Sequence, residues 1–182
     1  MDALCRIELL GGLRVQCRER RITRFRTRKT AALLAYLAYH PQRTHAREVL
    51  IERLWPESGA ESGRSRLSQA LTWLRDQLEE PGAPAPLLVA DRFSVGLVPA
   101  ALITDVAEFE AALRAAGAAD GAAARVSALA EAVALYRGPL LPGYYEEWIV
   151  PEQQRLDEQF FQALRQLIGA LVEAGDFERA LP

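Results

Sequence analysis

The sequence predicts a mainly α-helical protein with a small amount of β structure. Three observations lead to this fold class. Apolar and polar residues alternate only in short runs, near the start of the chain and around residue 92. Three segments with helical spacing of apolar residues lie between these runs, and helical patterns continue from residue 105 onward. Half of the 182 residues are hydrophobic, so the chain can bury a substantial core.

The first elements are strands. Residues 4–9 and 13–18 alternate around Gly11 and Gly12, which predicts a hairpin, and residues 22–25 predict a third short strand. Such a hairpin brings Cys5 and Cys17 close together, so a disulfide is sterically possible. A single pair of cysteines without an export signal usually stays reduced, and we therefore expect half-buried thiols.

Two short helices follow the strands. The segment "TRKTAALLAYLAYHP" has a broad apolar stripe and stops before Pro41. The segment "THAREVLIERLWP" has the same pattern, with Thr44 as a candidate N-cap and Pro56 as the stop.

The third helix is amphipathic and is predicted over residues 62–79, after a polar bridge. Its apolar residues repeat at helical spacing on one narrow stripe: Leu67, Ala70, Leu71, Leu74 and Leu78. After the break "PGAPAP", the segment "LLVADRFSVGLV" predicts a second hairpin that turns at Asp91 and Arg92. Strands, three helices and a closing hairpin are the elements of a winged helix-turn-helix, and we assign it to residues 1–98.

Residues 105–182 predict an array of stacked helices. Asp105 and Glu108 have the spacing of a capping box, and residues 151–174 carry apolar residues on two sides, as in stacked helical repeats. Gly175 and Asp176 then predict a helix end followed at once by a new helix start. We therefore expect the chain to be the front of a longer polypeptide with a truncated helical array.

The distribution of charged residues also differs between the winged helix-turn-helix and the helical array. Residues 1–98 carry 16 Lys and Arg against 11 Asp and Glu, whereas residues 99–182 carry 6 against 13. Seven of the basic residues lie in residues 18–29. A basic first half favours a polyanionic partner, because cations that neutralise phosphates release condensed counterions.

Several classes of function find no support in the sequence. It has no glycine-rich phosphate loop, no nucleophile elbow and no spacing of metal ligands, so we expect no enzyme, no cofactor and no metal. No run approaches the roughly 18 apolar residues of a membrane span. Because residues 1–25 also lack a secretory pattern, a cytoplasmic protein without a membrane partner is expected.

The candidate site is a surface for double-stranded DNA. A helix that enters the major groove needs neighbouring cations on the flanking phosphates, and the basic segment before and within the first helix supplies them. The outward face of the third helix carries hydrogen-bonding side chains that can read bases. The candidate phosphate contacts are Arg24, Arg26, Arg28 and Lys29, and the candidate base contacts are Arg64, Ser65, Arg66, Ser68, Gln69 and Thr72.

Longer segments resemble a known family. The segments "IELLGGLRV", "RKTAALLAYLAYHP", "REVLIERLWP" and "RSRLSQALTWLRDQL" resemble the OmpR-type winged helix of the Streptomyces antibiotic regulatory protein (SARP) family. The segments "TDVAEFEAAL", "ALYRGPLLPGYYEEWIVPEQQRLDEQFFQAL" and "EAGDFERAL" resemble the bacterial transcriptional activator domain (BTAD) of that family. This resemblance implies an array of helices similar to tetratricopeptide repeats. The resemblance covers nearly the whole chain.

The resemblance implies a transcriptional activator that binds tandem promoter repeats, associates there with further copies of itself and contacts RNA polymerase. It implies that residues 62–79 form the recognition helix and that Arg92 contacts the minor groove. It also implies that the bridge at 57–62 faces the polymerase, with Glu57, Ser58 and Glu61. The outward ring of Trp73 has no assigned role in this pattern, and the activator domain is incomplete.

The alternative is a protein-interaction scaffold, or the output domain of a larger regulator with an ATPase module and repeats, whose winged helix binds protein instead of DNA. Such a module would present an apolar outward face on the third helix. The face here is mostly polar and basic, which favours DNA.

Overall fold

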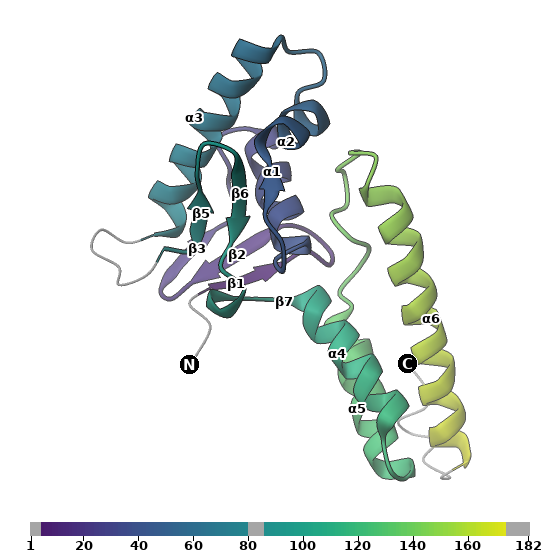
Figure 1. Cartoon of the computed structure of the whole chain (residues 1–182). Helices are drawn as coiled ribbons and strands as arrows, with labels where there is room; N and C mark the ends of the chain where they lie inside the picture. Colours follow the sequence, from purple (N-terminus) through teal and green to yellow (C-terminus); the bar gives the residue numbers. More distant parts are fainter. Residues whose placement is uncertain (1–4, 80–85, 174–182) are drawn as a thin grey trace. The chain divides into compact units, whose positions relative to one another are not determined.

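The computed structural model describes residues 5–79 and 86–173, which form two compact units (Figure 1). The first unit comprises residues 1–8 and 13–104, and the second comprises residues 9–12 and 105–182. The elements of the first unit are β1 (Cys5–Glu8), β2 (Arg14–Cys17), β3 (Arg20–Ile22), α1 (Arg28–Tyr39), β4 (His45–Ala46), α2 (Arg47–Leu54), α3 (Ala60–Leu78), β5 (Leu88–Ala90), β6 (Ser94–Leu97), η1 (Pro99–Ala101) and β7 (Leu102–Thr104). Those of the second are α4 (Asp105–Ala118), α5 (Ala122–Leu135) and α6 (Ile149–Glu173).

The first sheet contains four strands in the order β3-β2-β1-β7. The first three strands are antiparallel, as the hairpin pattern predicts, and β7 adds to β1 in parallel. The third strand lies at Arg20–Ile22, slightly before the predicted residues 22–25.

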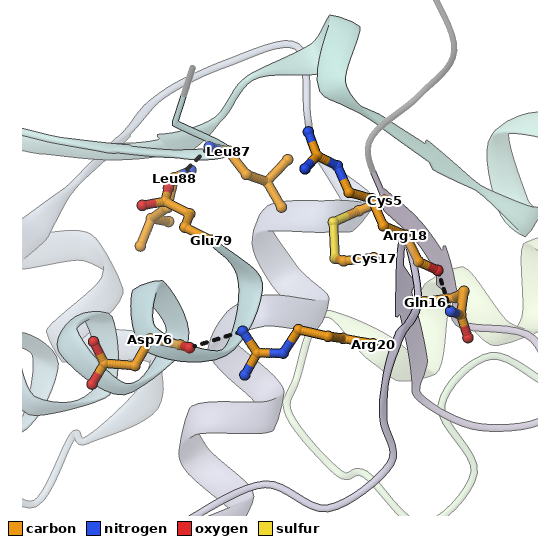
Figure 2. Close-up of a disulfide and its surroundings, with 9 residues drawn as sticks. All are labelled: Cys5, Gln16, Cys17, Arg18, Arg20, Asp76, Glu79, Leu87 and Leu88. Carbon is orange, nitrogen blue, oxygen red and sulfur yellow. Dashed lines mark hydrogen bonds between the residues drawn. A yellow bond between two sulfur atoms is a disulfide. The ribbon is translucent and has the colours of Figure 1, made fainter. Parts of the chain in front are cut away.

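Cys5 and Cys17 are directly opposed across β1 and β2 and form a disulfide (Figure 2). The expectation of reduced thiols is wrong for this structure. Both residues are buried, at 2% and 5% exposure. Their facing positions follow from the hairpin register, which brings two cysteines on the same face of adjacent strands within bonding reach.

The second sheet is the wing, with strand order β4-β6-β5. The hairpin β5–β6 is the one predicted from residues 87–98. Thr44 does not cap α2, which corrects a prediction: residues His45 and Ala46 pair with β6, and α2 begins directly after them at Arg47.

The core of the first unit lies under α1 and α3. Every residue from Thr30 to Ala38 in α1 is buried. The stripe predicted for the third helix is buried as well, and α3 begins at Ala60, before the predicted start. A Cβ on Gly63 would lie 2.3 Å from Ile51 Cγ2, so this glycine permits the close contact between α3 and α2.

The C-terminal end of α3 is tied to its neighbours by polar contacts (Figure 2). The carboxylate of Glu79 accepts hydrogen bonds from the backbone N–H groups of Leu87 and Leu88, each at 2.9 Å. Arg20 of β3 donates to the carbonyl of Asp76 at 3.4 Å. The helix is therefore attached at this end both to the first sheet and to the start of the wing.

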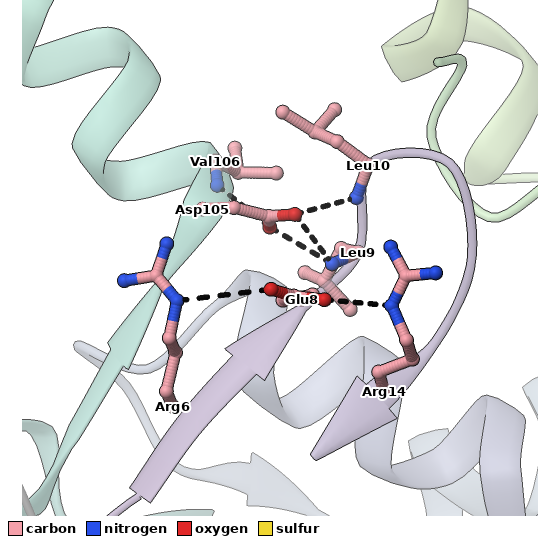
Figure 3. A network of polar contacts seen from close by, with 7 residues as sticks. All are labelled: Arg6, Glu8, Leu9, Leu10, Arg14, Asp105 and Val106. Atoms are coloured by element: carbon pink, nitrogen blue, oxygen red, sulfur yellow. Dashed lines mark hydrogen bonds and ion pairs between the residues drawn. The ribbon is translucent and has the colours of Figure 1, made fainter. Parts of the chain in front are cut away.

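A buried carboxylate organises the second unit. Asp105 is 3% exposed and accepts hydrogen bonds from the backbone N–H groups of Leu9, Leu10 and Val106 at 2.8 to 3.0 Å (Figure 3). Leu10 forms a bridge with Leu140. The residues at the tip of the first hairpin thus pack with the helices of the second unit.

The helices of the second unit pack in sequence, α4 on α5 and α5 on α6. Their core includes Ala116, Leu129 and Ala163. The ring of Tyr136 stacks on Phe160, 4.3 Å between centroids. Its hydroxyl donates to Asp157, and burial, together with this hydrogen bond and the charge of Asp157, raises the pKa of Tyr136.

Only one of the two predicted apolar sides of α6 is covered within the described residues. Leu156 and Leu171 are buried, whereas Phe161, Ile168 and Val172 are exposed. The helix predicted after Gly175 lies outside the described residues. Within residues 5–79 and 86–173, no helix has the length and apolar character needed to cross a bilayer.

Candidate nucleic-acid interface

The basic segment is held against α3 by two aromatic rings. Phe25 precedes α1 and packs on Trp73 of α3 with 5.7 Å between ring centroids. The flanking Arg24 and Arg26 are exposed. At the start of α1, Thr27 Oγ1 accepts a hydrogen bond from the Thr30 N–H, which is an N-cap. The segment therefore presents cations beside a capped helix N-terminus, where anions are favoured.

A first hollow of about 390 Å³ lies between the start of α1 and the middle of α3. It is lined by two predicted phosphate contacts near the start of α1, Arg26 and Lys29, and by two predicted base contacts on α3, Arg66 and Gln69. Its lining residues are Arg26, Thr27, Lys29, Thr30, Trp55, Arg66, Gln69 and Ala70.

A second hollow of about 310 Å³ adjoins the first along the outward face of α3. Arg26 and Gln69 line both hollows, which makes the surface continuous. The lining residues of the second hollow are Arg26, Ser65, Ser68, Gln69, Thr72, Trp73 and Asp76. The single carboxylate at one end, Asp76, limits the length over which this face can meet a phosphate strand.

The predicted polymerase loop lies at the other end of α3. Glu57 and Ser58 lie in the turn after α2, and Glu61 lies in the first turn of α3. Arg64 lines a separate hollow of about 280 Å³ with Glu48, Glu52 and Ser58, among other residues. Arg64 therefore lies beside the carboxylates of α2 and outside the two hollows on the outward face of α3.

The carboxylate of Asp91 stabilises the turn at the tip of the wing. Asp91 Oδ1 accepts hydrogen bonds from the backbone N–H groups of Phe93 and Ser94, each at 2.7 Å. These bonds are the main cause of the lowered pKa of Asp91. The Arg92 guanidinium lies 4.5 Å from the centroid of the Phe93 ring, and Phe93 is 65% exposed. The tip of the wing thus presents a cation on an aromatic ring.

Comparisons with known proteins agree with this geometry. Residues 24–92 match the family described as "Transcriptional regulatory protein, C terminal", and residues 104–182 match the family described as "Bacterial transcriptional activator domain". The chain has the SARP-type architecture. Both matched families are domains of transcription regulators.

The SARP-type fold is also found among solved structures. Mycobacterium tuberculosis EmbR, solved in complex with a low-affinity phosphopeptide, is similar with a TM-score of 0.76 and 25% sequence identity. The similarity covers 96% of this chain and 47% of the EmbR chain, so this chain spans less than half the length of that one. No curated protein sequence matches the chain. The predicted fold class, mainly helical with a winged helix-turn-helix followed by a helical array, is confirmed.

The fold gathers most, but not all, of the predicted contacts into the two hollows. Arg24, Arg28, Arg64 and Arg92 are exposed but line neither hollow. Several of the polar side chains on α3 bond within the protein: Gln69 Nε2 donates to Ser65 Oγ at 3.3 Å, and Thr72 Oγ1 donates to the Ser68 carbonyl at 3.0 Å. These contacts are on the exposed face, so the groups can exchange them for contacts with a ligand.

Thr27, Thr30 and Trp55 line the first hollow and were not predicted as contacts. Arg47 and Phe93, which lie outside both hollows, were not predicted either. Arg47 contacts both α3 and the wing turn, and Phe93 forms the exposed ring under Arg92. Phe93 could have been found in the sequence as an apolar residue inside a predicted turn. Arg47 carried no local signal, because its partners are 21 and 44 residues away.

Proposed function

We propose that the chain binds double-stranded DNA in a sequence-specific manner and activates transcription. In this proposal residues 1–98 are the DNA-binding domain and residues 105–182 are the first part of an activator domain. The observation that carries the proposal is the continuous surface of the two hollows. It brings cations of the segment before α1 next to the polar outward face of α3.

The chemistry of this surface suits a duplex. The guanidinium groups of Arg26 and Arg66 can pair with phosphates or with guanine edges, because a planar fork donates two parallel hydrogen bonds. Gln69 can bond an adenine edge in the same bidentate way. The N-terminus of α1 adds backbone donors for a flanking phosphate. We therefore assign α3 to the major groove and the basic segment to the backbone beside it.

The wing extends the contact. Arg92 at the exposed turn is suited to the minor groove, where the negative potential attracts arginine. The remaining predicted contacts, Arg24, Arg28, Lys29, Arg64, Ser65, Ser68 and Thr72, complete the proposed surface.

The proposed protein contacts lie elsewhere. The acidic carboxylates of Glu57 and Glu61, with Ser58, are exposed or half-exposed next to α3 and would face RNA polymerase. The acidic residues 99–182 would repel phosphate, so we assign them to contacts between copies on tandem sites or to the polymerase. A cytoplasmic location is part of the same proposal.

Selection from a pool of random duplexes, using the whole chain, tests binding, specificity and repeat spacing together. We expect an enriched motif in tandem copies. Arg66→Ala should lose the enrichment, whereas Arg75→Ala, which removes the same charge from an exposed position of α3 outside both hollows, should retain it. If the chain bound no duplex even at low salt, that result would contradict DNA binding. It would favour a protein ligand for the winged helix.

The activator role needs a separate experiment. Transcription in vitro from a promoter that contains the selected motif should rise when the chain is added. Glu57→Ala with Glu61→Ala should lower this activation while leaving the DNA affinity unchanged. An unchanged transcription yield with this double variant would remove the polymerase contact from the proposal.

A further inference from the structure

Arg47 joins three parts of the winged helix. It is the first residue of α2 and is half-buried. Its backbone N–H donates to the Phe93 carbonyl at 2.9 Å, and its Nη1 donates to the Asp91 carbonyl at 3.1 Å, so it holds the wing turn at two points. Its Nη2 donates to Ser68 Oγ on α3, also at 3.1 Å.

We infer that Arg47 is a positioning residue that holds the wing tip and α3 at a fixed spacing, so that both can engage a duplex at once. This inference rests on the proposed DNA binding. It assigns to Arg47 no contact with DNA; its effect on binding passes through the position of Arg92 on the wing relative to α3.

The guanidinium group is suited to this role. It is planar and carries five N–H donors in a fixed fork, so one arginine can bond two acceptors on different elements while keeping their separation. A lysine ammonium is a point donor on a flexible stem and cannot impose such a spacing. The distances to the Asp91 carbonyl and to Ser68 Oγ are equal, as expected of a group that bridges the two.

The wing turn is stiff enough to transmit the position. The carboxylate of Asp91 closes the turn by accepting bonds from the Phe93 and Ser94 N–H groups and from Ser94 Oγ. Arg92 lies within this turn, with its guanidinium over the Phe93 ring. Fixing the Asp91 and Phe93 carbonyls therefore fixes the base from which Arg92 extends. Ordering a loop before binding lowers the entropic cost of the complex.

The inference is tested by a double-mutant cycle on the selected duplex, with Arg47→Met and Arg92→Ala alone and together. We expect Arg47→Met to weaken binding about tenfold in the wild-type background and less than about twofold when Arg92 is already alanine. An equal loss in both backgrounds would show that the effect of Arg47 does not pass through Arg92, which overturns the inference. Arg92→Ala without any loss of affinity would overturn it too.

The conservative variant separates position from charge. Arg47→Lys keeps the positive charge but cannot bridge both acceptors, so it should bind about as weakly as Arg47→Met. Full recovery by lysine would mean that only the charge matters. Arg53→Met is the matched control, because it removes an arginine from the same helix whose guanidinium lies over Tyr36, 5.1 Å from the ring centroid. It should bind as the wild type does.

Ser68→Ala keeps the experiment informative should the Arg47 variants unfold. It removes one acceptor of Arg47 from an exposed position of α3. Because Ser68 also lies on the proposed DNA surface, part of its loss of affinity can be direct, but the loss should be smaller in the Arg47→Met background than in the wild type. An equal loss in both backgrounds would overturn the inference. Failure of the wild-type chain to bind any duplex would instead contradict the proposed function.

Discussion

The ring of Trp73 in α3 packs on the ring of Phe25 in the segment before α1, with 5.7 Å between the centroids and 52° between the planes. This contact explains a side chain that the sequence left without a role. Trp73 is half-buried against the protein instead of standing free on the outward face of α3. The same contact keeps Arg26 at the edge of the two hollows.

We predict that Phe25 and Trp73 are energetically coupled. Tilted aromatic pairs contribute about 0.5 to 1.5 kcal/mol beyond the area they bury, so a double-mutant cycle of Phe25→Ala and Trp73→Ala should give a coupling of about 1 kcal/mol. Each single variant should lower the free energy of unfolding by about 2 kcal/mol, because both rings are only partly buried. Urea unfolding of the four proteins measures both quantities. Strictly additive losses would contradict the pairing.

The pattern of apolar residues was sufficient to predict the three helices of the first unit and the wing hairpin. In α2 and α3 the spacing of apolar residues marks the one buried face, and α1, which is buried throughout from Thr30 to Ala38, has a broad apolar stripe that stops before Pro41. The pattern also placed Arg26, Arg66 and Gln69 on surfaces that the fold brings together. What it could not predict depends on distant partners. Residues His45 and Ala46 become a strand only because β6 pairs with them, which is why Thr44 was misread as a helix cap.

The same reason explains the other differences. The tip of the first hairpin packs with the helices that follow residue 104, through Asp105 and Leu140. No local sequence pattern predicts such a contact. The hairpin predicted that Cys5 and Cys17 lie close together, but the disulfide was not predicted, because cysteine usage indicates only the usual redox compartment. Arg47 was missed because its role arises from three elements at once.

Asp105 should be among the most sensitive positions for stability. Asp105→Ala leaves the buried N–H groups of Leu9 and Leu10 without their acceptor, and each such group costs about 1 to 3 kcal/mol. We therefore expect a loss of about 3 kcal/mol or more in urea unfolding. Asp105→Asn keeps one acceptor oxygen and should lose less. Asp120→Ala, at an exposed position, is the control and should unfold as the wild type does.

The burial of the His45 side chain predicts that the protein loses stability in weak acid. His45 is 7% exposed, and within the described residues its Nε2 has no hydrogen-bond partner. Burial lowers its pKa most, the charges of Arg43 and Arg53 lower it further, and a hydrogen bond with the His40 backbone opposes the shift. The folded pKa thus lies below the unfolded value of about 6.5. The contribution of neutral His45 to the free energy of unfolding is therefore fully present above about pH 6.5, and it is lost as the pH falls through the folded pKa.

The measurement is the urea midpoint from pH 8 down to pH 5 for the wild type and for His45→Gln. Other groups titrate in this range in both proteins, so the difference between the two curves isolates His45. We expect the wild-type midpoint to fall more steeply below about pH 6.5. Parallel curves would show that burial does not disfavour the charged imidazole. Tyr36→Phe controls for a change in the neighbouring packing, since it alters the ring that lies 4.8 Å from the His45 ring without removing an imidazole.

The final prediction separates backbone contacts from base contacts. If five or six cations meet phosphates, the logarithm of the affinity should fall with the logarithm of the salt concentration at a slope of about −5 per subunit. Arg28→Ala should weaken binding to all duplexes about equally and reduce the steepness of this slope by about 1, because it removes one phosphate contact.

Arg66→Ala should behave differently, because Arg66 lines the first hollow together with Gln69 on α3, where bases would lie. Removal of the Arg66 side chain should weaken the free energy of binding to the selected duplex by about 1 to 3 kcal/mol. It should also abolish discrimination between bases at one position of the motif. Titrations of the two variants against selected and scrambled duplexes at several salt concentrations measure all these effects. If Arg28 controlled discrimination and Arg66 only the slope, the recognition surface and the anchoring surface would have to be exchanged, and α3 would lie along the backbone instead of in the groove.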